Sequence, residues 1–182
     1  MRAAGLAFET TAPLVDEAEI KASAQSAHAS ADDTAVLLAE MKARRVAGRA
    51  PEALVVGADQ LLVCEGRWFD KPRDVMEARA NLQYLRGRVH TLVTAVVVQR
   101  GTTRLWHYVA QPLMTMRSFS DIFLDAYLAA EGNSVMQSVG GYRVEGAGLH
   151  LFDRINGEHS AILGLPMLPL LGFLRQNGVV MT

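Results

Sequence analysis

The sequence predicts an α/β protein, in which helices pack on a mixed β-sheet. Segments with the helical hydrophobic period alternate with short apolar runs that are rich in β-branched residues. Two strand-like runs, residues 89–99 and 104–115, follow one another across a short link that contains Gly101. We interpret them as a long antiparallel hairpin, which breaks a strict strand–helix–strand order.

The composition bounds the class of protein. Hydrophobic residues make up 50% of the 182-residue chain and charged residues 20%, so we expect a single domain spanning residues 1–182 with a packed core. The net charge of −1 argues against a nucleic acid polymer as partner. The single cysteine, Cys64, excludes an internal disulfide and a cysteine-rich zinc site. Because the sequence holds no apolar run of roughly 20 residues and no signal-peptide pattern, we expect a cytoplasmic protein without a membrane partner.

Helices are expected at residues 33–47, 74–86, 121–130 and 166–176. Asp32 or Asp33 is the expected N-cap of the first helix. Asp74 is the expected N-cap of the second, with Glu77 in the position of a capping box. Ser120 precedes the third helix and is its expected cap.

Two further strands are expected. Residues 54–63 form an apolar run that fits one strand, or two strands joined at Gly57. Residues 149–155 form the other, followed by an Asn156-Gly157 turn.

Asp59 is the residue that most clearly indicates chemistry. It lies within the apolar run of residues 54–63, where an ionised carboxylate must be paired, hydrogen-bonded or bound to a metal. Gly57 just before it permits a close backbone approach. The alternative is an aspartate in a hairpin turn that hydrogen-bonds its own backbone, and local sequence does not separate the two.

Two lysines are candidates for binding phosphate. Lys71 precedes Pro72, which biases it towards an extended conformation, and its ammonium suits a phosphate oxygen. Lys42 projects from a largely apolar helix face. A solvated loop lysine and a lysine snorkelling at the edge of its face are the respective alternatives.

Three other residues are weaker candidates on local sequence. Glu17 belongs to an acidic pair near the N-terminus, which is more often a surface feature. Arg88 is either a phosphate clamp or a charge that complements a helix C-terminus. His90 has no second His or Cys at metal-ligand spacing and fits a histidine at the start of a strand.

The order of short motifs along the chain resembles the Maf family of nucleoside triphosphate pyrophosphatases. The segments that carry the resemblance are Val15-Asp-Glu17, Lys42-Ala43, Val56-Gly-Ala-Asp59, Asp70-Lys-Pro72, Leu85-Arg-Gly-Arg88, Gly140-Gly-Tyr-Arg-Val-Glu-Gly146 and Leu163-Gly-Leu-Pro166. They run from about Gly5 to the C-terminal helix, so the resemblance covers nearly the whole chain.

The resemblance implies a fold similar to that of the inosine triphosphate pyrophosphatases, with a nucleotide cleft between two lobes. It implies hydrolysis of a nucleoside triphosphate to the monophosphate and pyrophosphate with a divalent cation, Mg²⁺ or Mn²⁺, and a homodimer. Asp59 matches the family's catalytic aspartate, which usually accepts the proton. Glu17 matches an acidic residue that helps Asp59 hold the metal, and Lys42 and Lys71 match lysines that face the phosphates, where Arg88 is a further candidate.

Gln60 and Glu145 resemble the branch of the family that acts on 7-methylguanosine triphosphate. A carboxylate suits guanine, whose N1–H and exocyclic amine are adjacent donors, and it repels the carbonyl-rich edge of a pyrimidine. The alternative is that Glu145 only pairs with Arg143 or another cation.

The sequence departs from the family pattern in two places, the first of which favours an alternative, a catalytically impaired nucleotide-binding or regulatory homologue. The retained site residues favour the enzyme: Glu17, Lys42, Asp59 and Lys71. The family opens with a strand and a Ser/Arg loop, whereas this sequence starts at Met1-Arg-Ala-Ala-Gly-Leu-Ala-Phe-Glu9. A start codon assigned too late, a shortened chain and a real loss of activity each explain this. The second departure is Met136-Gln-Ser-Val139, where much of the family has Asp-Lys-Ala-Gly, so Gln137 or Ser138 would replace a lysine.

Overall fold

A computed structural model describes residues 1–181 of the chain. The α-helices are α1 (Glu17–Ser26), α2 (Ala31–Ala47), α3 (Val75–Leu85), α4 (Asp121–Glu131), α5 (His159–Ile162) and α6 (Met167–Gln176). The strands are β1 (Val55–Cys64), β2 (Arg67–Phe69), β3 (Val89–Arg100), β4 (Thr103–Ala110), β5 (Leu113–Met116) and β6 (Phe152–Asn156). Short 3₁₀ helices span η1 (Arg2–Ala4), η2 (Gly132–Gln137), η3 (Val139–Gly141) and η4 (Ala147–Leu151). No helix within residues 1–181 is long and apolar enough to cross a bilayer.

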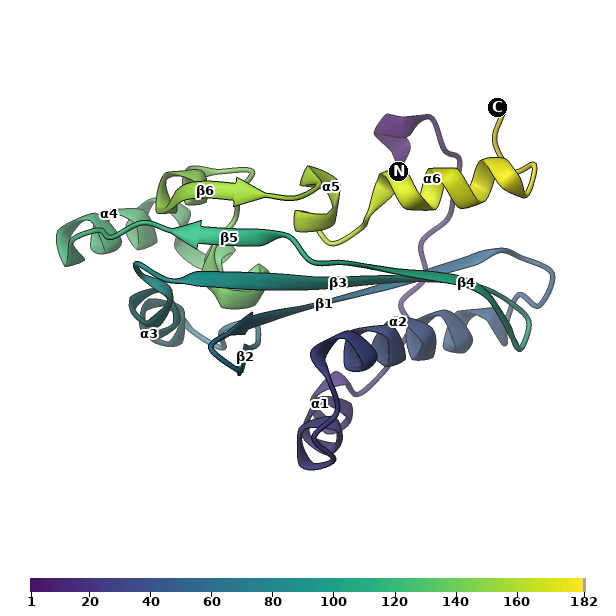
Figure 1. Cartoon of the computed structure of the whole chain (residues 1–182), viewed down its shortest axis with the longest axis horizontal. Coiled ribbons are helices and arrows are strands. Elements are labelled where there is room, and N and C mark those ends of the chain that lie inside the picture. Colours follow the sequence, from purple (N-terminus) through teal and green to yellow (C-terminus); the bar gives the residue numbers. More distant parts are fainter. Residues whose placement is uncertain (182) are drawn as a thin grey trace. The chain divides into compact units, whose positions relative to one another are not determined.

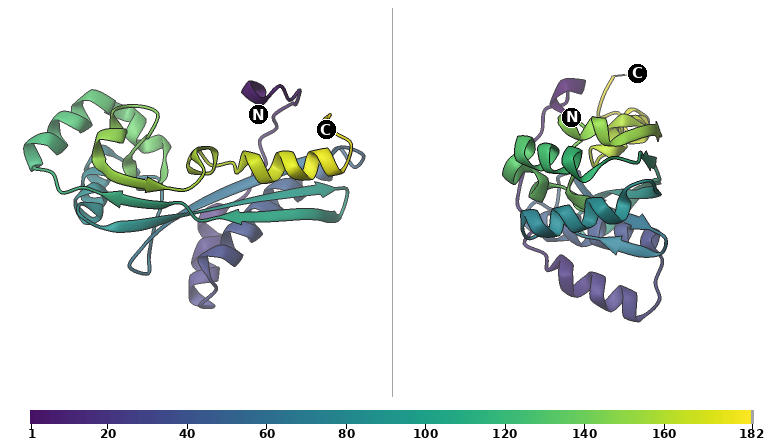
Figure 2. Two further views of the ribbon diagram at one scale, coloured as in Figure 1. Left: turned by 45° about the horizontal axis from the view of Figure 1, so that its top comes forward. Right: turned by 90° about the vertical axis from the view of Figure 1, so that its left-hand side faces the viewer.

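The strands form one sheet in the order β2-β1-β3-β5-β6, and β4 also pairs with β3. The β1–β2, β3–β4, β3–β5 and β5–β6 pairs are all antiparallel. The left view of Figure 2 shows β4 returning along β3. Helices flank this sheet, so the predicted α/β class is confirmed (Figure 1).

The predicted long hairpin is present, but its second strand is interrupted. β4 pairs with β3 from Thr94 onward, and β5 pairs with the preceding stretch of β3 from Val89 to Thr91. Pro112 lies between β4 and β5, where it has no N–H to donate to a ladder, although its carbonyl accepts from Leu92 N–H at 3.0 Å.

The chain folds into two compact units, each assembled from segments that are distant in sequence. The first unit comprises Met1–Asp59, Thr94–Ala110 and the described residues from Glu158 onward. The second comprises Gln60–Val93 and Gln111–Gly157. β1 and β3 therefore each contribute residues to both units. That the chain behaves as a single domain stays a prediction.

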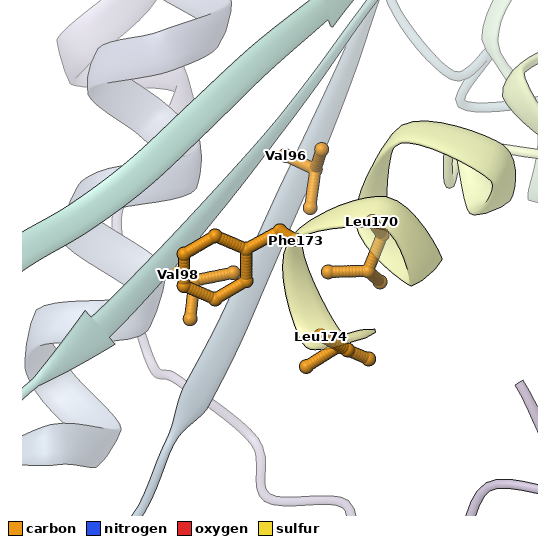
Figure 3. Close-up of a cluster of buried hydrophobic side chains, with 5 residues drawn as sticks. All are labelled: Val96, Val98, Leu170, Phe173 and Leu174. Atoms are coloured by element: carbon orange, nitrogen blue, oxygen red, sulfur yellow. The ribbon is translucent and has the colours of Figure 1, made fainter. Parts of the chain in front are cut away.

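In the first unit α6 packs on one face of β3. Leu170, Phe173 and Leu174 recur at helical spacing and project towards Val96 and Val98, which point to the same side of β3 (Figure 3). The five side chains are at most 8% exposed and form a buried cluster. α2 covers the opposite face of the strands in this unit (Figure 1).

Gly57 sets how closely α2 approaches β1. A Cβ atom on Gly57 would lie 2.2 Å from the Ala39 carbonyl oxygen and 2.9 Å from the Ala43 nitrogen. Any larger residue would therefore separate the helix from the strand. β1 continues without a break through this glycine, so the run is one strand and the hairpin-turn interpretation of Asp59 is wrong.

In the second unit the glycines of η3 pack closely against α3 and β1. A Cβ atom on Gly141 would lie 3.2 Å from the Ala78 Cα atom, and one on Gly140 would lie 2.5 Å from Leu62 Cδ1. Both glycines have a positive φ, 77° at Gly140 and 83° at Gly141, so any other residue there would be strained.

Local capping explains most of the helix boundaries. Asp74 Oδ1 accepts from Glu77 N–H at 2.7 Å, and Ser120 Oγ accepts from the backbone of α4, so both predicted caps are confirmed. The cap of α2 was predicted wrongly. It is Ser30, whose Oγ accepts from Asp33 N–H at 3.0 Å, because the helix begins at Ala31, two residues earlier than expected.

Other elements also differ from what the sequence predicted. α1 was not predicted, because it contains no buried residue and so lacks an apolar stripe. The strand expected at residues 149–155 begins only at Phe152, because the 3₁₀ helix η4 occupies Leu149 to Leu151.

Candidate active site

Three predicted site residues of the first unit form one ion cluster. The Lys42 Nζ atom lies 2.6 Å from Asp59 Oδ1 and 2.7 Å from Glu17 Oε1. The side chains of Asp59, Lys42 and Glu17 are 4%, 18% and 43% exposed. The cluster therefore runs from the interior at Asp59 to the solvent at Glu17.

The elements that carry these residues explain the arrangement. Lys42 lies on the face of α2 that also carries the fully buried Leu38, so its stem is buried and its ammonium is directed at β1. Glu17 is the first residue of α1, where the helix dipole favours a carboxylate. The helix starts there because Asp16 Oδ1 accepts from Glu19 N–H at 3.1 Å.

Burial and ion pairing shift the pKa values of Asp59 and Lys42 in opposite directions. Burial raises the pKa of Asp59, hydrogen bonding to Lys42 offsets only part of this effect, and the charge of Glu17 raises it further. Burial lowers the pKa of Lys42, but its hydrogen bonds to Asp59 and Glu17, together with the negative charges of both, outweigh burial and leave that pKa raised. Lys42 therefore stays charged, and Asp59 is a stronger base than an exposed aspartate. Lys21, one turn after Glu17 on α1, also acts electrostatically on Asp59.

The cluster contains a buried acceptor without a partner in the described part of the chain. Asp59 Oδ2 is buried and has no hydrogen-bond partner among residues 1–181. A buried carboxylate oxygen is costly to leave unpaired, so this atom is the natural acceptor for a water proton or for a cation. Within the described residues, no group of three or more His, Cys, Asp or Glu side chains forms a site that could hold a metal ion. Mg²⁺ commonly takes only one or two protein carboxylates together with water and substrate phosphate, so Glu17 and Asp59 fit such an ion.

The remaining predicted phosphate ligands belong to the second unit. Lys71 is exposed and follows β2, next to the buried Pro72. Arg88 is half-buried. Its Nη1 donates to the Tyr84 carbonyl at the end of α3, its Nε lies 3.2 Å from Glu65 Oε2, and its guanidinium stacks on the Tyr84 ring. In this arrangement the charge of Arg88 complements the C-terminus of α3, as the alternative interpretation expects. That Arg88 binds phosphate stays a prediction.

The two predicted base-reading residues also belong to the second unit. Gln60 directly follows Asp59 on β1 and is half-buried. Glu145 is exposed and forms no ion pair within residues 1–181. Arg143 pairs instead with Glu131, at 3.9 Å between Nη1 and Oε2, so the proposed Glu145–Arg143 pair is absent from the described chain.

Two other residues considered at the sequence level have structural partners. His90 is 1% exposed, and its Nε2 lies 2.8 Å from the Tyr142 hydroxyl, in keeping with a core histidine. Ser138, one of the possible substitutes for the family's lysine, donates its hydroxyl to the Tyr142 carbonyl.

Sequence reasoning missed Glu131. It is the last residue of α4, and it contacts the loop that carries Glu145. No local pattern could have found it, because its partners lie 12 and 16 residues further along the chain.

Comparison with known proteins gives a consistent result. Residues 1–177 match the profile of a family described as "Maf-like protein". A nucleoside triphosphate pyrophosphatase of Granulibacter bethesdensis is 53% identical over 174 residues, which cover 96% of this chain and 88% of that protein. One of Rhodospirillum rubrum is 50% identical over 98% of this chain and 89% of its own length. A 7-methyl-GTP pyrophosphatase of Rhizobium meliloti is 45% identical over 97% of this chain and 89% of its own length.

Proposed function

The chain belongs to the Maf family, and on that premise we propose that it is a nucleoside triphosphate pyrophosphatase, a hydrolase of acid anhydrides. The substrate is a nucleoside triphosphate, and the products are the monophosphate and pyrophosphate. The observation that carries the proposal is the Glu17–Lys42–Asp59 cluster, with its unpaired Asp59 Oδ2. Relatives named for this activity support it.

The reaction needs a base and positive charge. Water attacks the α-phosphorus, the bond from that phosphorus to the bridging oxygen breaks, and pyrophosphate leaves. Asp59 accepts the proton of the attacking water at Oδ2, and its raised pKa suits that role. Lys42 provides a permanent positive charge beside Asp59, where it stabilises negative charge on the phosphate oxygens.

Glu17 and Asp59 would hold the divalent cation, Mg²⁺ or Mn²⁺. The chemistry that the cation supplies when bound is neutralisation of charge on the triphosphate. Glu17 suits this role because its carboxylate is the most exposed of the cluster and is linked to Asp59 through their shared partner Lys42. In the second unit, Lys71 and Arg88 would bind phosphate oxygens, which are common to every nucleotide.

The finer proposal concerns the base. We assign base selection to Gln60 and Glu145, with preference for a guanine-type base, including N7-methylated guanine. Glu145 is exposed and has no cation of the described chain beside it, so its carboxylate is available to accept from N1–H and the exocyclic amine. N7 methylation makes guanine cationic, which adds attraction to the same carboxylate. The relative named 7-methyl-GTP pyrophosphatase supports this choice.

The activity is tested by measuring pyrophosphate release from a panel of nucleoside triphosphates with Mg²⁺ or Mn²⁺. The panel should contain 7-methylguanosine, guanosine, uridine and deoxythymidine triphosphates. We expect release that depends on the cation and is fastest with a guanine-type base. No release from any nucleotide with either cation would refute the proposed function.

The base assignment makes a separate prediction. Replacing Gln60 with Thr and Glu145 with Gln should shift preference towards uridine and deoxythymidine triphosphates. A bound base would shield the Glu145 carboxylate from water, and a charged group that is desolvated and left unpaired costs about 1–3 kcal/mol, so the shift should be roughly 5- to 150-fold in relative kcat/KM. An unchanged substrate ranking in the double variant would show that these residues do not read the base, even if the enzyme is active.

A further inference from the structure

We propose that Glu131 is a positioning residue for base selection, which holds residues 143–147 in the conformation that presents Glu145. The inference rests on the proposed function, because it concerns the residue to which we assign recognition of the base. It adds a residue that does not touch the nucleotide and acts through the loop.

The carboxylate of Glu131 contacts both ends of this loop. Its Oε1 accepts from Ala147 N–H at 2.9 Å, and its Oε2 lies 3.9 Å from Arg143 Nη1. The Glu131 side chain is 10% exposed. A hydrogen bond to a charged acceptor is stronger than a neutral one, and burial strengthens it further. One side chain thereby fixes the first and the last residue of the segment.

The loop between these two contacts is a tight turn. Gly146 N–H donates to the Arg143 carbonyl at 3.3 Å, which leaves Glu145 at the corner of the turn and exposed to solvent. A Cβ atom on Gly146 would lie 2.6 Å from Glu131 Oε1, so the Glu131 carboxylate packs directly against the turn. A Cβ atom on Gly148 would lie 2.2 Å from the Arg143 carbonyl oxygen, so the backbone at Gly148 also packs closely against Arg143.

The place of Glu131 on its helix argues for a dedicated role. It is the last residue of α4, where the partial negative charge of the helix C-terminus disfavours a carboxylate. A largely buried carboxylate at that position depends on partners outside the helix, and the loop supplies them. The charge of Glu131 also reaches the buried Tyr127 one turn earlier, where it adds to the effect of burial in raising the pKa of the phenol.

The decisive comparison uses two variants of nearly equal size. Glu131→Gln keeps an oxygen that can accept from Ala147 N–H, whereas Glu131→Met removes it. Asp125→Asn is the matched control, because Asp125 is another ion-paired carboxylate on α4 but pairs with Arg79. For each protein, kcat and KM are measured with 7-methylguanosine and uridine triphosphates, and hydrogen exchange is measured at the Ala147 amide.

We expect the Met variant to lose the preference for the guanine-type base by roughly tenfold, because the ordered turn is lost. The loss should appear in KM for that substrate more than in kcat. Ala147 N–H should exchange faster in the Met variant than in the wild type. The Gln variant should retain most of the preference and of the protection, and the Asn control should retain all of both.

Gly146→Ala gives a second, independent route to the same change, because the added methyl group would displace the Glu131 carboxylate. Unchanged base preference in both the Met and Ala variants, or unchanged exchange at Ala147 in the Met variant, would overturn the inference. A wild type that cleaves no nucleotide would instead overturn the proposed function and remove the basis of the inference. The exchange rates would still show whether Glu131 orders the loop.

Discussion

Asp59 unites two properties that a strand residue seldom has, nearly complete burial and an oxygen without a partner. Sequence alone could single it out because a carboxylate within an apolar run requires explanation. Lys42 was identifiable on similar grounds, as a charge on an apolar helix face. The pairing of the two could not be predicted from local pattern, because it depends on how closely α2 approaches β1.

Asp59→Asn should abolish pyrophosphate release while leaving the fold intact. The amide keeps the shape of the side chain but cannot act as a base and lacks the negative charge that attracts a cation, so turnover should fall by ~10²-fold or more. Steady-state assays, with circular dichroism as a check on folding, would measure this. Turnover near that of the wild type would mean that another group accepts the proton.

His90 should make the protein less stable in mild acid. Burial lowers its pKa from 6.5 to about 4. The free energy of unfolding is at its full value well above pH 6.5, where the imidazole is neutral in both the folded and the unfolded state. It decreases as the pH falls from 6.5 towards 4, because the unfolded state takes up the proton first. Between about pH 7.5 and about pH 5 the loss should be about 2 kcal/mol.

Urea unfolding at both pH values would measure this loss, with His90→Gln as the comparison because it lacks the titrating ring. The variant should lose less stability on acidification than the wild type. Equal losses in the two proteins would show that carboxylates alone are responsible.

At the scale of elements, sequence patterns predicted most helices and strands well, and the failures have physical causes. α1 was missed because a helix without a buried stripe has no periodic signal. The pairing of both β4 and β5 with β3 could not be read from an apolar run, since only Pro112 marks the break. Helix ends were predicted best where a side-chain cap defines them, as at Asp74.

Gly57→Ala should loosen the contact between α2 and β1. A methyl group 2.2 Å from the Ala39 carbonyl oxygen cannot be accommodated without moving the helix, which should destabilise the fold by about 1–3 kcal/mol or more. Because α2 carries Lys42, the same shift should lower turnover.

Gly172→Ala is the control for this variant. Gly172 lies within α6 and has open space at its Cβ position, so alanine there should be neutral or stabilising by up to ~1 kcal/mol. Thermal unfolding and pyrophosphate release of both variants would test the pair. A Gly57→Ala protein as stable and as active as Gly172→Ala would show that α2 adapts without loss.

At the scale of the whole molecule, the two compact units share strands β1 and β3. Neither unit can lose its part of these strands without disturbing the backbone of the other. We therefore predict a single cooperative unfolding transition, in keeping with the single domain expected from length.

The two tryptophans allow a direct test. Trp68 on β2 belongs to the second unit and Trp106 on β4 to the first. Trp68→Phe and Trp106→Phe each leave one fluorescent reporter. Each denaturation curve should coincide with the far-ultraviolet circular dichroism of the same variant. Fluorescence and dichroism curves that separate within either variant would show that the units unfold independently.

The boundary between the units falls between Asp59 and Gln60, adjacent residues of one strand. Adjacent strand residues point to opposite faces, so changing one need not disturb the contacts of the other. If the proposed roles hold, bond cleavage relies on a carboxylate of the first unit, while choice of base relies on residues of the second. Substrate range could then drift during evolution without a passage through inactive intermediates. Related chains could share the residues that cleave the phosphate anhydride and still hydrolyse different nucleotides.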